Sequence, residues 1–168
     1  FFRRLFAEGA FSQAFLPILA ETKANENDIE VQLVINHIAT KLLSVLMIIT
    51  LIAVVAAPLV IFIFAWGFYF KADSSQFNLA SDMLRITFPY LLLISLTALS
   101  GSILNTYDNF TVPAFTPVLL NISLIFSAIY LSQFLNNSIL ALAWGVLIGG
   151  ILQLAFQIPF LRKIKKLP

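Results

Sequence analysis

Long stretches without a charged residue constrain this chain more than any other feature. Three of them cover residues 42–70, 86–107 and 109–161. A helix needs about 20 mostly apolar residues to cross a hydrocarbon layer about 30 Å thick. The third stretch holds 53 residues and would be about 80 Å long as one helix, so it must fold as two. Residues 132–138 (SQFLNNS) contain two adjacent asparagines that favour a turn, which places the break there.

The composition agrees with a membrane protein. Only 11% of the residues are charged and 60% are apolar, whereas a soluble domain carries about 25% charged residues. The predicted fold class is therefore all-α, a single polytopic transmembrane helix bundle. About five membrane helices are expected, over residues 1–20, 28–66, 80–106, 114–132 and 139–162. Because the chain opens on Phe1 with arginines already in helical context, we expect it to be a piece of a longer membrane protein.

Two polar connections separate the first three predicted spans. The first is ETKANENDIE (21–30), in which Asn27 and Glu30 have the spacing of a capping box for the next helix. The second covers residues 71–84 and is long enough for a short surface helix.

Positive charge is unevenly divided between the two sides that this topology predicts. Connections alternate sides when counted back from the last span, which ends in RKIKK (162–166). Six lysines and arginines fall on the RKIKK side, and only Lys71 and Arg85 fall on the other when the intrahelical Arg3 and Arg4 are left out. Cytoplasmic loops carry the excess of Lys and Arg, so the RKIKK end is predicted to be cytoplasmic.

The opening FFRRLFAEGAF (1–11) places three charges in a predicted membrane helix. Such charges are costly and usually face a bundle interior or a watery cavity. Arg4, Glu8 and Ser12 follow one another at one-turn intervals, so Arg4 has a carboxylate within reach. Arg3 points about 100° away, toward a face of alanines with no local carboxylate.

An arginine without a local counter-charge suits a phosphate, because its planar guanidinium binds two oxygens at once. The residues alone leave an alternative open. Both arginines could lie near the interface and extend their charges to the lipid headgroups.

Other spans carry polar or small residues on one face. A possible cavity or packing face is formed by Ser95, Ser102 and Asn105 in the third span and by Asn121 in the fourth. Asn121 is predicted to bridge to a neighbouring helix. The last span repeats small or polar residues every four positions, at Ala141, Gly145, Gly149, Gln153 and Gln157. This spacing favours close helix packing of the GxxxG type over contact with a substrate.

The sequence contains no pattern typical of an enzyme, a metal site or a cofactor site. The lone His37 belongs to no HExxH motif, cysteine is absent, and no nucleophile or acid pair occurs. A net charge of +2 is too small to indicate nucleic acid. Asp82 and Arg85, three residues apart, are predicted to form a helix-start cap and an ion pair at the outer surface.

Three segments of the chain resemble one known family. They are RRLFAEGAFSQAFLPILAE (3–21), ITFPYLLLISLTALSGSILNTYDNFTVPAFTPVLLNISLI (86–125) and ALAWGVLIGGILQLAFQIPFLRKI (141–164). They closely resemble the MurJ (MviN) family of bacterial lipid II flippases, in the multidrug/oligosaccharidyl-lipid/polysaccharide exporter superfamily. The resemblance spans almost the whole chain. It implies the amino-terminal lobe of a two-lobe transporter, from partway through the second helix to the end of the sixth.

The resemblance also implies a function and a site. The family carries lipid II, the undecaprenyl-diphosphate-linked peptidoglycan precursor, from the inner to the outer leaflet of the bacterial cytoplasmic membrane by alternating access. Its motif places a diphosphate-binding arginine at Arg3 and a functionally sensitive acid at Glu8; Arg4, Glu8 and Ser12 are expected to support Arg3. The expected partners are lipid II, membrane lipids and the remaining helices of the same parent protein.

Two other functions compete with this one. The first is a related superfamily exporter, either a cation-coupled drug antiporter or a flippase for another polyprenyl-linked glycan. The second is a membrane scaffold that transports nothing. An anionic cargo distinguishes the flippase from a drug exporter, and an arginine that faces a cavity favours the anion.

Overall fold

The computed structural model of the chain describes residues 10–25, 27–64, 74–135 and 137–168, which contain helices and no strands. The helices are α1 (Ala10–Asn25), α2 (Asp28–Val55), α3 (Ala57–Phe64), α5 (Ser74–Thr106), α6 (Thr111–Ile129), the 3-10 helix η2 (Leu131–Gln133) and α7 (Ser138–Lys163). Four described segments are long and apolar enough to cross a membrane: Asp28–Val55, Ser75–Thr106, Thr111–Gln133 and Ser138–Lys163. The prediction of an all-α membrane bundle is confirmed.

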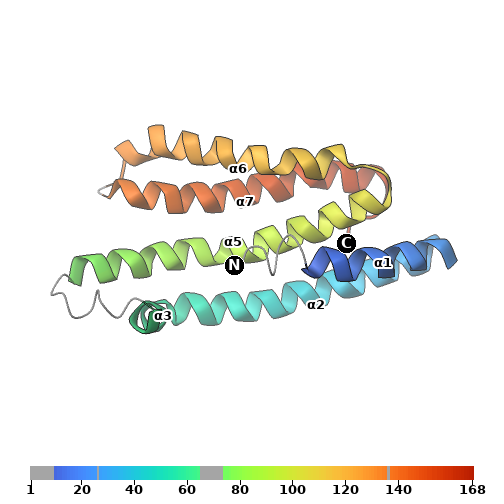
Figure 1. Cartoon of the computed structure of the whole chain (residues 1–168), viewed down its shortest axis with the longest axis horizontal. Coiled ribbons are helices and arrows are strands. Elements are labelled where there is room, and N and C mark those ends of the chain that lie inside the picture. Colours follow the sequence, from blue (N-terminus) through green and yellow to red (C-terminus); the bar gives the residue numbers. More distant parts are fainter. Residues whose placement is uncertain (1–9, 26, 65–73, 136) are drawn as a thin grey trace.

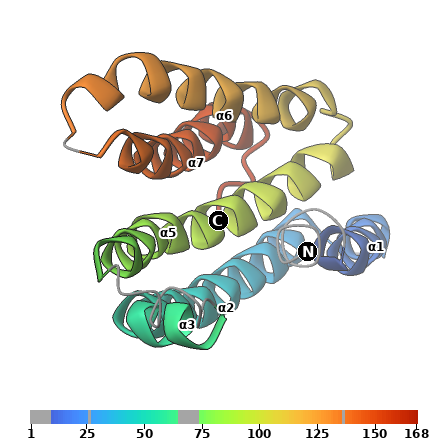
Figure 2. The same ribbon diagram turned by 60° about the vertical axis from the view of Figure 1, so that its left-hand side comes forward.

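Helix α5 forms the middle of the bundle. Figure 1 shows α6 and α7 side by side on one side of α5, with α1 and α2 on the other, and Figure 2 shows the same order after rotation. Helix α5 contacts α1, α2, α3, α6 and α7. It therefore connects the two layers.

The predicted polar connections are mostly helical. Helix α1 continues to Asn25, α2 begins at Asp28, and α5 already begins at Ser74. The prediction of connections over 21–30 and 71–84 was therefore wrong in extent. Neither described segment contains Pro or Gly, and each further helical residue adds a backbone hydrogen bond, so polarity alone does not end the helix.

The two caps predicted at helix starts, at Asn27 and at Asp82, are not formed as predicted. Asn27 is the N-cap residue of α2 with extended backbone, but its side chain makes no capping hydrogen bond, so the predicted box with Glu30 is not formed. The carboxylates of Asp28 and Glu30 instead place negative charge in the first turn. Asp82 lies inside α5 rather than at its start, although its predicted ion pair with Arg85 is present at 3.2 Å. Both side chains are about half exposed, so the pair contributes about 1 kcal/mol at most.

The helix predicted over 28–66 is divided near Pro58. Helix α2 ends at Val55 and α3 begins at Ala57. Pro58 has no N–H to donate to the carbonyl of Val54, which interrupts the hydrogen-bond ladder. Figure 1 shows α3 nearly end-on at the end of α2, so the chain turns here. Residues 65 and 66 lie outside the described residues.

The predicted break in the longest charge-free stretch is confirmed. Helix η2 is followed by a bend, and α7 begins at Ser138 after extended Asn137. Helix α6 begins at Thr111, three residues before the predicted start. Pro113 is tolerated there because the N–H groups of a first helical turn have no partner in the helix.

Helices α5 and α7 end in the same way. The N–H of Asn109 donates to the carbonyl of Leu104 at 2.9 Å, and the N–H of Lys166 donates to that of Leu161 at 3.0 Å. This is the Schellman arrangement, which needs one residue in the left-handed region. The residues in that region are Asp108 (φ 59°) and Lys165 (φ 56°).

The apolar core lies at the end of the bundle where α1 meets α2. Its buried members come from five helices: Phe15, Leu19, Val31, Ile35, Ala39, Leu99, Ile103, Leu104, Val112 and Leu161. Lys23 contacts the end of α5 at this end, and Lys166 contacts the start of α2. The two basic segments that were predicted to share one side of the membrane therefore share one end of the bundle.

Candidate functional site

The charged motif that carries the strongest prediction lies mostly outside the described residues. Arg3, Arg4 and Glu8 precede the first described residue. Ser12 lies within α1, but its side chain is not among those described. The predicted roles of these four residues stay predictions.

The polar face predicted on α5 points into the bundle. Ser95 and Ser102 are buried, and Asn105 is half-buried. The hydroxyl of Ser95 donates to the carbonyl of Leu91 at 2.8 Å, and that of Ser102 donates to Ala98 at 2.9 Å. Hydroxyls that bond back four residues satisfy themselves on their own helix. Each of these two hydroxyls therefore has an acceptor on its own helix, and the predicted cavity or packing role of the face stays a prediction.

Asn121 has a different environment from the one predicted. It lies on the exposed side of α6, between exposed Val118, Ile122 and Ile125. The predicted bridge to a neighbouring helix is not formed among the described helices.

Close packing between α6 and α7 is confirmed at the glycine positions. A Cβ on Gly145 would come within 2.8 Å of Ser127 Cβ, and one on Gly149 within 2.6 Å of Leu120 Cδ1. The hydroxyl of Ser123 donates to the carbonyl of Gly145 at 2.7 Å. The absence of side chains at these glycines lets the two backbones approach each other, as small residues do in membrane helix pairs.

The two glutamines of the α7 stripe make contacts that the sequence did not reveal. Gln153 and Gln157 are buried. The amide of Gln153 donates to the backbone carbonyl of Thr116, and that of Gln157 to the Thr116 hydroxyl, each at 3.1 Å. Their spacing of one turn was the only available signal, and it did not identify their partner on α6.

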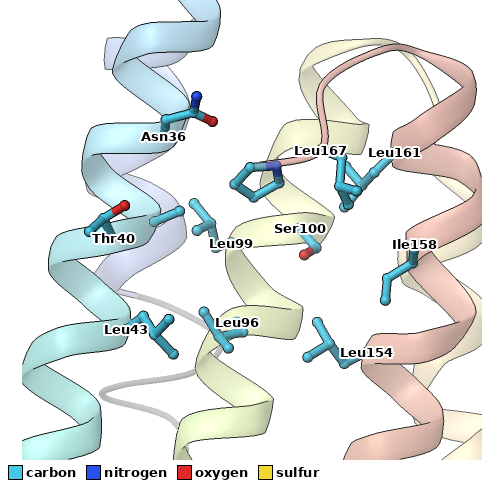
Figure 3. A pocket seen from close by; sticks show the side chains of 12 residues that line it. Asn36, Thr40, Leu43, Leu96, Leu99, Ser100, Leu154, Ile158, Leu161 and Leu167 are labelled. Atoms are coloured by element: carbon cyan, nitrogen blue, oxygen red, sulfur yellow. The ribbon is translucent and has the colours of Figure 1, made fainter.

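A groove of about 460 Å³ lies between α2, α5 and α7. Figure 3 shows it lined by leucines and Ile158, with Asn36, Thr40 and Ser100 as polar members. None of its lining residues is charged. The groove suits hydrocarbon in size and chemistry, but it offers no counter-charge to a diphosphate.

A cluster of polar side chains at the α1–α2 end was also missed. Lys166 is buried, with a side chain 5% exposed, and its ammonium lies 3.0 Å from Asp28 Oδ1. Lys23 donates to the carbonyl of Thr106. From the sequence, both lysines were predicted only to orient the chain in the membrane by their charge. No local signal could pair residues so far apart in the sequence.

Comparison with known proteins agrees with these features. The sequence model of the family "Lipid II flippase MurJ" matches residues 1–168. The chain is 43% identical over 166 residues to a Burkholderia cenocepacia protein named lipid II flippase MurJ, covering 99% of this chain and 32% of that protein. It is 45% identical over 168 residues to a probable lipid II flippase MurJ of Vibrio cholerae, covering 97% of this chain and 32% of that protein.

A probable lipid II flippase MurJ of Haemophilus influenzae is 43% identical over 168 residues, which is 97% of this chain and 33% of that protein. The chain thus spans about a third of the length of these relatives. Together with the multi-pass helical bundle, the match over every residue leads to one conclusion: the chain belongs to the lipid II flippase MurJ family.

Proposed function

We propose that this chain is part of a carrier that moves lipid II from the inner to the outer leaflet of the bacterial cytoplasmic membrane. The observation that carries the proposal is the family match over the full 168 residues, with relatives named lipid II flippases at about 43% identity. The bundle of membrane-length helices supports a carrier embedded in the membrane. The activity belongs to the intact parent.

Within this function, Arg3 is the proposed contact for the lipid diphosphate. The groove between α2, α5 and α7 has no charged lining residue, which supports placing the anion elsewhere. The hydroxyl of Ser95 donates to its own helix, which supports a structural role for this residue. Among the predicted site residues, the arginine motif therefore keeps the cargo-binding role, with Arg4, Glu8 and Ser12 in support.

The direct test supplies the intact parent to cells depleted of their own lipid II flippase. We expect growth to resume and lipid II to become accessible to an impermeant enzyme that cleaves its headgroup at the outer surface. Lipid II that stays inaccessible, although the protein is present in the membrane at normal levels, would exclude the proposed cargo. Outward movement of a different polyprenyl-linked glycan, when the parent is supplied to cells that lack the flippase for that glycan, would identify the sibling exporter instead.

We also expect the end of the bundle that contains Lys23 and Lys165 to face the cytoplasm. Cytoplasmic ends carry the excess of positive charge. In intact cells, an impermeant thiol reagent should modify a cysteine placed at Asn137, which is exposed at the opposite end, and should spare cysteines placed at Lys23 or Lys165. Permeabilised cells, in which all three positions should react, serve as the control. The reverse labelling pattern in intact cells would invert the topology.

A further inference from the structure

Tyr107 lies where distant parts of the chain meet. It directly follows α5, and its ring is approached by the ammonium groups of two lysines. The Nζ of Lys23 lies 4.3 Å from the ring centroid, and that of Lys166 lies 5.9 Å from it. An aromatic face attracts a cation within about 6 Å. The ring therefore links α1 to the segment that follows α7.

Lys23 has a second contact at the same place. Its ammonium donates to the carbonyl of Thr106 at 2.8 Å. Thr106 is the last residue of α5, and carbonyls in the last turn of a helix lack partners within it. A cation there also interacts favourably with the negative end of the helix dipole. The Lys23 ammonium thus makes two contacts, with the Tyr107 ring and with the Thr106 carbonyl, that hold the end of α1 against the end of α5.

Lys166 connects the start of α2 to the same ring. Its ammonium donates at 3.0 Å both to the backbone carbonyl and to Oδ1 of Asp28. The Lys166 side chain is 5% exposed and that of Asp28 is 90% exposed. A buried ammonium is costly unless it keeps its counter-charge, so this contact ties the segment after α7 to α2.

The ring of Tyr107, and not its hydroxyl, makes these contacts. The hydroxyl oxygen is buried and has no hydrogen-bond partner among the described residues. Phenylalanine can therefore replace Tyr107 without loss of a described hydrogen bond, whereas leucine removes the aromatic face. This difference gives a matched pair of variants for the ring.

We propose that Lys23 and Tyr107 are positioning residues for cargo binding. With Lys166 they form a clasp that fixes the placement of α1, the helix that follows the Arg3 motif in the sequence. Among the described helices α1 contacts only α2 and α5. The clasp attaches α1 directly to the end of α5 and, through Tyr107 and Lys166, indirectly to the start of α2. The effect on cargo rests on the proposed function, whereas the effect on helix placement does not.

The placement of α1 can be tested without any cargo. Spin labels at Ala20 and Phe110, both exposed positions, report the distance between α1 and the turn after α5 in the intact parent in lipid nanodiscs. We expect one narrow distance distribution in the unmodified protein and in Tyr107→Phe. The distribution should broaden in Lys23→Met and in Tyr107→Leu. Lys163→Met removes an exposed charge from the end of α7 and should leave the distribution narrow. An unchanged distribution in Lys23→Met and Tyr107→Leu would overturn the clasp.

Transport kinetics test the positioning role. Lys23→Met should raise the half-saturating lipid II concentration about fivefold, the loss expected for one cation–π contact, with the maximal rate unchanged. Lys23→Arg keeps the charge and should restore the original value. A normal half-saturating concentration despite a broadened distance would overturn the positioning role. If the unmodified parent does not move lipid II, the proposed function fails, while the distance measurement still decides the clasp.

Discussion

Replacing Arg3 with alanine should nearly abolish lipid II translocation by the intact parent while leaving its abundance in the membrane close to normal. Arg3 has no carboxylate one turn away in the sequence, so its charge is available to the cargo. Hydrogen bonds to charged groups contribute about 1.5–3 kcal/mol, so the loss should be roughly ten- to a hundredfold. Outward accessibility of lipid II in a flippase-depleted strain, measured beside protein level, checks this.

Three variants of neighbouring charges provide the controls. Arg3→Lys keeps the charge but loses the two-pronged donor geometry, so we expect a partial defect. Arg4→Ala and Glu8→Ala each remove one partner of a predicted pair and leave the other charge unpaired. They should therefore share a loss of folded protein. Normal growth and normal abundance of Arg3→Ala would refute the diphosphate role and leave the opening charges with a structural one.

Replacing Gly145 with valine should destabilise the bundle by separating α6 from α7. A Cβ at this position would lie 2.8 Å from Ser127 Cβ, which is fixed to the backbone of α6, so the helices must move apart. That movement also lengthens the bond from Ser123 to the Gly145 carbonyl, now 2.7 Å. Overpacking of this kind costs about 1–3 kcal/mol. Thermal unfolding of the purified parent, whose relatives are about three times as long as this chain, should occur roughly 1–3 °C lower.

Ala155→Val is the matched control for this prediction. It adds the same type of side chain to the same helix, but Ala155 is exposed, so the unfolding temperature should be nearly unchanged. Equal unfolding temperatures for Gly145→Val and Ala155→Val would show that the α6–α7 contact tolerates separation. The close approach at Gly145 would then have no energetic importance.

The spans and one packing face could be predicted because hydropathy and helical spacing are local properties. All five residues of the stripe from Ala141 to Gln157 are buried, as a repeat of four predicts for one face of a helix. The start of α5 at Ser74 could not be predicted from polarity, because polar residues are found both in exposed helices and in loops. The division at Pro58 follows from the missing N–H of proline, which is a local property. It was not predicted because residues 42–70 form one continuous uncharged stretch.

The polar contacts between helices could not be predicted, because they depend on which faces meet in three dimensions. Lys166 lies in a basic run that is typical of a cytoplasmic flank, yet its side chain is buried against Asp28. The amides of Gln153 and Gln157 find Thr116 only because α6 and α7 are adjacent. Asn121 was predicted to meet a helix and lies exposed, because the face of α6 turned toward α7 is formed by Leu120, Ser123 and Ser127.

The Schellman ends of α5 and α7 have an energetic consequence for this end of the bundle. A non-glycine residue in the left-handed region is less stable by about 1–2 kcal/mol than in ordinary helical backbone. Asp108 and Lys165 both adopt it, immediately after Tyr107 and immediately before Lys166. Glycine would relieve this strain at either position. The backbone therefore adopts an unfavourable conformation at the end of each helix, directly beside Tyr107 and Lys166, whose side chains make contacts between distant parts of the chain.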